Sequence, residues 1–239
     1  MIPLLITTIS GLSTMLGIIP TFISDKYKNK IINFSLSFSA GTMITLSFFS
    51  LLIESFYSIK NILLVLIFIN LGIIISIIID KIISKKTNNT LYKVGITSLI
   101  ALILHNIPEG IITFISSNNN FKLGVTLSIG IALHNIPEGI SIAVPIFHAT
   151  NSRKKAFLLT SISAISELFG GILSLIFFKN IIGRAHLGIL YAITAGIMLQ
   201  ISFGELIKES LTYNNKKITL QGIIIGSIIM LLCIFYFKL

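Results

Sequence analysis

Charged residues are scarce in this chain of 239 residues, at only 11% of the total. An ordinary soluble domain is roughly one quarter charged. Hydrophobic residues make up 54% of the chain, and its mean hydropathy is +0.97. Because a water-soluble core does not account for so much apolar sequence, we interpret the chain as an integral membrane protein.

Cysteine and acidic residues are also few. The single cysteine, Cys233, lies in the last apolar segment, which excludes an internal disulfide and favours a packing role. There are 8 acidic residues against 18 Lys and Arg, giving a net charge of +10. The basic residues cluster in short segments between apolar stretches and form no basic domain, so we expect no nucleic-acid partner.

Eight apolar segments are long enough to cross a lipid bilayer, which takes about 20 residues each. They cover residues 2–23, 31–53, 61–79, 91–116, 122–147, 156–178, 186–207 and 218–237. The first segment lacks a basic n-region and a small-residue cleavage site, so we interpret it as a retained helix. The short connections leave no room for a soluble domain. The sequence predicts an all-α polytopic bundle, with residues 1–239 as one transmembrane domain.

The distribution of lysine and arginine predicts how the chain is oriented. Thirteen of these residues lie at the first, third, fifth and seventh connections or the adjoining segment ends, and five lie on the other side. This excess places the odd-numbered connections in the cytoplasm. The prediction is a multi-pass protein of the cell membrane with both termini outside.

The second and seventh segments contain an internal repeat with an offset of 155 residues. Eight of sixteen positions are identical between residues 40–55 and residues 195–210. Two such spans run in opposite directions, so the match indicates an inverted repeat, a feature of transporters with alternating access. The alternative explanation is that small residues recur wherever helices pack closely.

The hexapeptide His-Asn-Ile-Pro-Glu-Gly occurs twice, in the fourth and fifth segments. On a helix, His105 lies beside Glu109 and His134 beside Glu138, because residues at i and i+4 share a face. Both copies are equally far from the connection near Phe121, at a depth of about half the bilayer. Ionisable groups at that depth are costly, and they usually mark a functional site.

A third acid, Glu167, lies at a similar depth in the sixth segment. Two imidazoles and three carboxylates form a ligand set for divalent metals such as Zn²⁺, Fe²⁺, Mn²⁺ or Cd²⁺, whereas Cu(I) favours thiolates. Asn106 and Asn135 add amide oxygens one step around each helix. Gly110 and Gly139 remove bulk beside the glutamates, which predicts close approach of neighbouring helices.

Three further residues are weaker candidates for a metal pathway. Glu205 is the repeat equivalent of Ser50 and lies near the cytoplasmic part of its segment. It is either an exit or second-site ligand or a charge at a solvated helix end. Ser50 and Met43 are candidates to line the path, although core packing also explains Met43.

These motifs resemble the ZIP family of divalent-metal transporters, particularly its bacterial zinc-uptake members. The resemblance is carried by the paired hexapeptides, by Ser-Glu-Leu-Phe-Gly-Gly at residues 166–171 and by Ala-Gly-Thr-Met at residues 40–43. It implies a 3+2+3 helix arrangement, a homodimer and a metal site between the fourth and fifth helices. The implied ligands are His105, Asn106, Glu109, His134, Asn135, Glu138 and Glu167, with Glu205, Ser50 and Met43 near the site.

The chain departs from some bacterial members of that family, which carry an acid at the position of Ser50 and another at Gly204. The smaller negative charge leaves the metal preference open. The predicted function is uptake of divalent cations, zinc foremost, with no cofactor besides the transported metal. Two alternatives stand beside it: a membrane-embedded metalloenzyme, although His-Glu-x-x-His is missing, and a proton-coupled carrier of an organic solute.

Overall fold

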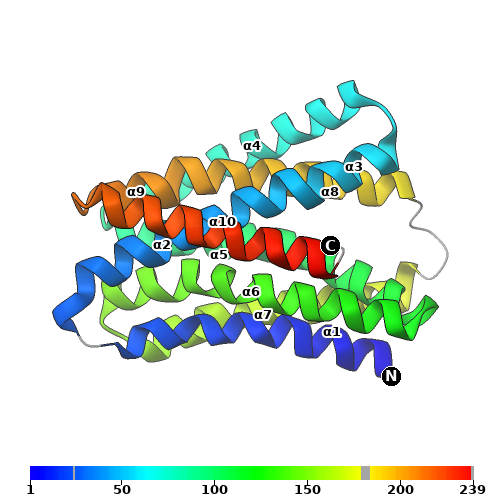
Figure 1. The fold of residues 1–239 in the computed structure, drawn as a ribbon, viewed down its shortest axis with the longest axis horizontal. Coiled ribbons are helices and arrows are strands. Elements are labelled where there is room, and N and C mark those ends of the chain that lie inside the picture. The colour runs from blue at the N-terminus through cyan, green and yellow to red at the C-terminus, as the bar shows by residue number, and fades with distance from the viewer. Residues whose placement is uncertain (24, 179–183, 238–239) are drawn as a thin grey trace.

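The computed structural model describes residues 1–23, 25–178 and 184–237, which form a bundle of long helices without a β-strand in these ranges (Figure 1). Eight helical stretches are long and apolar enough to cross a membrane. In chain order the elements are α1 (Ile2–Leu12), η1 (Ser13–Phe22), η2 (Asp25–Tyr27), α2 (Lys28–Leu46), η3 (Ser47–Leu51), α3 (Leu52–Ile59), α4 (Ile62–Ser84), α5 (Thr90–Asn119), α6 (Phe121–Thr150), α7 (Arg153–Leu173), η4 (Ser174–Phe178), α8 (Arg184–Ile201), η5 (Ser202–Ile207), α9 (Lys208–Leu211) and α10 (Lys216–Phe237).

The eight predicted spans are confirmed, and several helices extend beyond them. The second span was predicted at residues 31–53 and runs over Lys28–Ile59. The reason is that a hydrocarbon core of about 30 Å needs only about 20 apolar residues, while a helix continues through the polar headgroup layer. Of the basic residues used for the orientation, Lys179 and Lys238 lie outside the described residues.

Short polar connections start several of the helices. The side chain of Asn61 accepts hydrogen bonds from the backbone N–H groups of Leu63 and Leu64, and Asn89 caps α5 in the same way through Tyr92. Such caps satisfy N–H groups that have no partner within the helix. They fix where each span begins.

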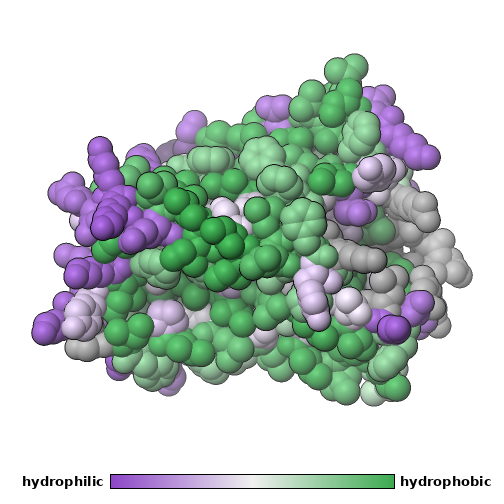
Figure 2. Space-filling view, viewed as in Figure 1, coloured by the Kyte–Doolittle hydropathy of each residue, from purple (hydrophilic) through white to green (hydrophobic). Residues whose placement is uncertain are grey.

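The two ends of the bundle differ in charge. Both termini lie at one end, which we call the terminal end, together with the connections near Lys60 and Asn120 (Figure 1). The opposite end, the basic end, carries the connections at residues 85–89, 151–152 and 212–215. Figure 2 shows hydrophobic side chains across the middle of the molecule and hydrophilic ones gathered at the basic end. This banding is that of a membrane-spanning bundle.

The spans pack in two groups of four. The motif group contains α1–η1, α5, α6 and α7, and the flanking group contains α2–α3, α4, α8–α9 and α10. Gly110 packs against the carbonyl group of Glu167 on α7, and Gly139 packs against the carbonyl group of Thr14 on η1, which confirms the predicted close approach. The flanking group has an equivalent contact, with Gly41 against the carbonyl group of Ile223. Close contacts between glycines and the backbone of a neighbouring helix therefore hold the helices together within each group.

The repeat predicted between the second and seventh spans has a structural counterpart. Each helix widens into a π-helical segment, η3 or η5, and these begin at Ser47 and Ser202, which are 155 residues apart. The Ser47 hydroxyl donates to the Met43 carbonyl at 2.8 Å, and the Ser202 hydroxyl donates to the Met198 carbonyl at 2.7 Å. The matching positions of the two π segments support a true repeat, whereas the serine bonds alone do not, because other helical serines form the same bond.

Candidate metal centre

The two hexapeptides face each other across α5 and α6. The Nε2 atom of His105 lies 3.1 Å from Glu109 Oε1 on its own helix and 3.3 Å from Glu138 Oε1 on α6. The Nε2 atom of His134 lies 2.8 Å from the same Glu109 oxygen. All four side chains are buried. The i, i+4 spacing within each helix and the antiparallel pairing of the helices bring the four groups into one cluster.

Three of these residues are arranged like metal ligands. One ligand atom each from His105, His134 and Glu138 lies within 4.8 Å of the other two. Glu109 connects the two imidazoles from the side. Imidazole nitrogen and carboxylate oxygen are the donors that Zn²⁺ and similar first-row cations accept.

Asn106, Asn135 and Glu167 form a second layer beside this cluster. The Asn135 side-chain N–H donates to Glu167 Oε2 at 2.8 Å and to the Ser10 carbonyl at 3.1 Å. The Asn106 side-chain N–H donates to the Ser163 carbonyl on α7 at 3.0 Å. Because the amide nitrogens are held by α1 and α7, the two amide oxygens are left available. The sequence did not reveal these partners, since Ser10 and Ser163 stand in no motif.

Several buried oxygen atoms in the two layers have no hydrogen-bond partner among the described residues. They are Glu109 Oε2, Glu138 Oε2, Glu167 Oε1, Asn106 Oδ1 and Asn135 Oδ1. Buried polar atoms are nearly always paired, so such a concentration needs a ligand. The described ion-pair contacts of Glu109 and Glu138 are to the two histidines. Three carboxylates in a low-dielectric interior need more positive charge than these two imidazoles supply, and a divalent cation can provide it.

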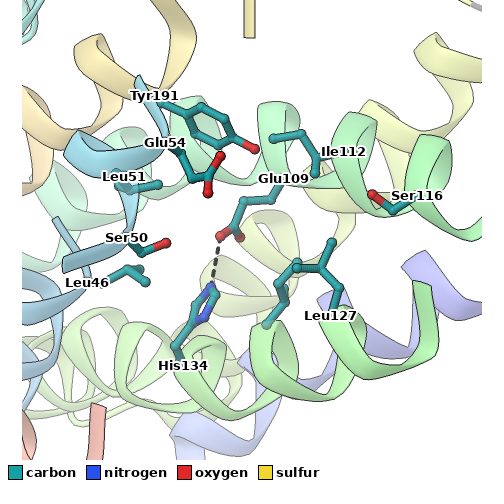
Figure 3. A pocket seen from close by; sticks show the side chains of 11 residues that line it. Leu46, Ser50, Leu51, Glu54, Glu109, Ile112, Ser116, Leu127, His134 and Tyr191 are labelled. Atoms are coloured by element: carbon teal, nitrogen blue, oxygen red, sulfur yellow. Dashed lines mark hydrogen bonds and ion pairs between the residues drawn. The ribbon is translucent and has the colours of Figure 1, made fainter. Parts of the chain in front are cut away.

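A cavity of about 260 Å³ leads to this centre from the terminal end. Its lining includes Glu109 and His134 at the bottom and Ser116 and Leu127 farther along α5 and α6 (Figure 3). In the other direction, toward the basic end, buried aliphatic side chains such as those of Leu102 and Ile142 fill the interior. Among the described residues, a cavity thus reaches the centre from the terminal end, and packed side chains cover it toward the basic end.

The flanking group supplies part of the cavity wall. Ser50 lies on the π segment η3, Glu54 one turn later on α3, and Tyr191 on α8. Figure 3 shows the side chains of Glu54 and Tyr191 directed toward Glu109. The sequence alone favours an interfacial charge for Glu54, which directly follows the predicted span 31–53, and it gives no sign of a role for Tyr191. Only the packing of α3 and α8 against the motif group places them beside the metal centre.

The three weaker candidates are separated in the structure. Ser50 lines the cavity, whereas Met43 is buried in the hydrophobic core and is not among the cavity-lining residues. Glu205 lies toward the basic end, where the Lys93 ammonium is 3.4 Å from its carboxylate and 2.7 Å from that of Asp80. Glu205 is therefore not grouped with the histidines.

Comparison with known proteins leads to the same family that the sequence motifs resemble. A sequence model of the family described as ZIP Zinc transporter matches residues 84–234. A zinc transporter ZupT of Clostridium perfringens is 32% identical over 274 aligned positions, covering 98% of this chain and 95% of that protein. Proteins with the same name from Campylobacter jejuni and Streptococcus mutans are 35% and 33% identical, with coverage of 97% and 98% of this chain and 94% and 96% of theirs.

Proposed function

The chain belongs to the ZIP family of zinc transporters, and we propose that it carries Zn²⁺ into the cytoplasm through the centre formed by the two hexapeptides. It is a multi-pass membrane transporter and not an enzyme, so the metalloenzyme alternative is set aside. A carrier of organic solutes is disfavoured because the curated relatives are named for zinc.

One observation carries the proposal for the site: around the two imidazoles lie buried acceptor atoms that have no hydrogen-bond partner in the part of the chain that the structure describes. We infer that His105, Glu109, His134 and Glu138 bind the transported ion. Asn106, Asn135 and Glu167 offer further oxygens beside it, either for a second ion or for the same ion as it moves. The donor set also suits Fe²⁺, Mn²⁺ and Cd²⁺, so we propose a range of divalent substrates with zinc preferred.

The direction of transport follows from the charge distribution. The basic end faces the cytoplasm by the positive-inside rule, so both termini and the mouth of the cavity lie outside. The ion enters through this mouth, and the inverted repeat provides for a second conformation in which the centre opens inward. Movement down the electrochemical gradient of the metal then needs no other energy source. The homodimer implied by the family resemblance stays a prediction.

Zinc uptake into liposomes tests the proposal. The purified protein is reconstituted, and zinc entry is followed with an indicator inside the vesicles. Glu109→Gln and Glu138→Gln keep the size of each side chain while removing a charged ligand. We expect uptake to fall by about 100-fold or more, since even indirect partners of a metal are worth about 10- to 100-fold.

Asp25→Asn is the matched control, because it neutralises an acid that lies between the first two spans. Its uptake should equal that of the wild type. Gel filtration of each variant checks that the protein still folds. Normal uptake of every tested metal by both Glu109→Gln and Glu138→Gln would show that the site is assigned wrongly.

A further inference from the structure

The wall of the cavity that leads to the metal centre is mostly aliphatic. Leu46, Leu51, Ile112, Leu127 and Ile131 make up much of it. A divalent cation that leaves water for such a space loses hydration, and the loss is costly unless oxygen ligands replace the water. The polar groups along the wall therefore decide whether the ion can enter.

Glu54 supplies a negative charge to the wall of the cavity that leads to the metal centre. Its carboxylate comes from the flanking group, whereas Glu109 and His134 at the bottom belong to the motif group. None of the described residues that line the cavity is a lysine or an arginine that would neutralise Glu54. Both Glu54 and Tyr191 line this cavity, and Figure 3 shows their side chains projecting toward Glu109.

Glu109 lines the same space. Its Oε1 atom is shared by the two histidines, while its Oε2 atom is buried and has no hydrogen-bond partner among the described residues. Ser50 also lines this cavity from the π segment, four residues or about 6 Å of helix rise before Glu54. The carboxylates of Glu54 and Glu109 and the hydroxyl groups of Ser50 and Tyr191 thus line one cavity.

We propose that Glu54, together with the hydroxyl groups of Tyr191 and Ser50, is a capture site for a partly hydrated divalent cation, which then passes to the free oxygen of Glu109. The proposal rests on the proposed transport function and adds a second, outer station to it. In this proposal a residue of the flanking group, Glu54, binds the ion first. The ion therefore contacts both groups of helices before it reaches the ligands of the motif group.

Kinetics of zinc uptake separate a capture site from the transport site. Removing the outer ligand weakens binding before the rate-limiting movement, so Glu54→Gln should raise KM about fivefold or more and leave Vmax within about twofold. Glu54→Asp should lie close to the wild type, and Glu54→Lys, which places a tethered cation in the cavity, should raise KM most.

Tyr57→Lys is the matched control for the added charge. Tyr57 is on the same helix, is exposed and does not line this cavity, so its KM should stay unchanged. Wild-type KM in both Glu54→Gln and Glu54→Lys overturns the capture site. A loss of Vmax at constant KM also overturns it, because a structural role then explains the residue.

A second measurement does not depend on transport. In a Cys233→Ser background, Ser116→Cys places one thiol on the cavity wall. Glu54 concentrates cations there, so a cationic thiol reagent should react faster than a neutral one of the same size. Glu54→Gln should lower this ratio at least about twofold, and an unchanged ratio contradicts capture.

The two hypotheses fail in different ways. If the wild type takes up no divalent metal, the transport function is wrong. If the wild type transports zinc and Glu109→Gln does not, while Glu54→Gln has wild-type KM and labelling, only the capture site is wrong.

Discussion

At the scale of single residues, the metal centre differs from an all-oxygen cation site because it contains two imidazoles. His105 and His134 each place Nε2 against Glu109, one from each hexapeptide. Nitrogen ligands favour Zn²⁺ over Mn²⁺, for which carboxylate and carbonyl oxygens suffice. The histidines should therefore set the choice among metals, while the carboxylates supply the charge that any dication needs.

Replacing one imidazole by an oxygen ligand tests this division. We expect His134→Gln to lower zinc uptake more than manganese uptake and to shift the Mn/Zn ratio about tenfold toward manganese. Competition between the two metals in the vesicle assay measures the ratio. His148→Gln is the control, because His148 lies on the same helix about 21 Å farther along and should leave the ratio unchanged. Equal losses for both metals would show that the imidazole does not determine preference.

At the scale of elements, the sequence predicted the number of helices and the pairing of the two hexapeptides. Depth estimates were enough to bring His105, Glu109, His134 and Glu138 to one level, because an α-helix has a fixed rise per residue. They were not enough for Glu54, whose position near the end of its span suggested an interfacial charge. Its place in the cavity depends on how α3 packs against α8 and the motif group. The spacing of residues along a single helix does not predict such packing between helices.

The π segments were also beyond prediction from the sequence. One lies at Ser174–Phe178, and the other two lie at Ser47–Leu51 and Ser202–Ile207. Both of these segments start with Ser-Phe. In the sequence this pair indicates only that the two spans are similar, and it does not predict a π-helix. Ser50 and Glu205 occupy equivalent places in these segments, one toward the terminal end and one toward the basic end.

Close helix contacts at glycine lead to a prediction of stability. A Cβ atom at Gly110 would meet the backbone carbonyl of Glu167, which has no room to move within α7. Gly110→Ala should therefore destabilise the protein by about 1–3 kcal/mol through overpacking. Gly171→Ala is the control, since a Cβ there would meet side-chain atoms of Thr7 and Leu4.

Unfolding of the two variants in SDS, followed by circular dichroism, compares their midpoints. Gly171→Ala should lie near the wild type, because alanine favours a helix by about 1 kcal/mol over glycine and offsets the tighter contact. A stable Gly110→Ala variant with an unchanged midpoint would mean that α5 and α7 can separate freely at this contact.

For the molecule as a whole, the division into two groups suggests how access to the centre alternates. The glycine contacts at Gly110, Gly139 and Gly41 each lie within one group. Between the groups, the Ser39 hydroxyl on α2 donates to the Pro137 carbonyl on α6 at 2.6 Å, and Lys93 on α5 pairs with Asp80 on α4 and Glu205 on η5. Buried hydrophobic side chains of both groups, such as Met43 and Ile142, also belong to one cluster, but none of the described glycines packs against the backbone of the other group. The interface between the groups is therefore where the molecule can rearrange.

Lys93 should hold the basic end closed, because its ammonium joins the motif group to two carboxylates of the flanking group. Lys93→Met keeps the aliphatic part of the side chain and leaves Asp80 and Glu205 facing each other without a counter-ion. The balance between conformations should shift about threefold toward opening at this end, as expected for a partly exposed ion pair worth less than 1 kcal/mol.

A thiol at Leu99, which is buried on α5 between Lys93 and His105, reports the opening when introduced with Cys233→Ser. We expect a membrane-impermeant reagent applied at the basic end to label Leu99→Cys faster in the Lys93→Met variant. Exchanging the charges with Asp80→Lys and Lys93→Asp should bring labelling back, because the ion pair is restored in reverse. If labelling is the same with and without Lys93, the closure of this end depends on the aliphatic packing around Leu102 and Ile142 and not on the ion pairs.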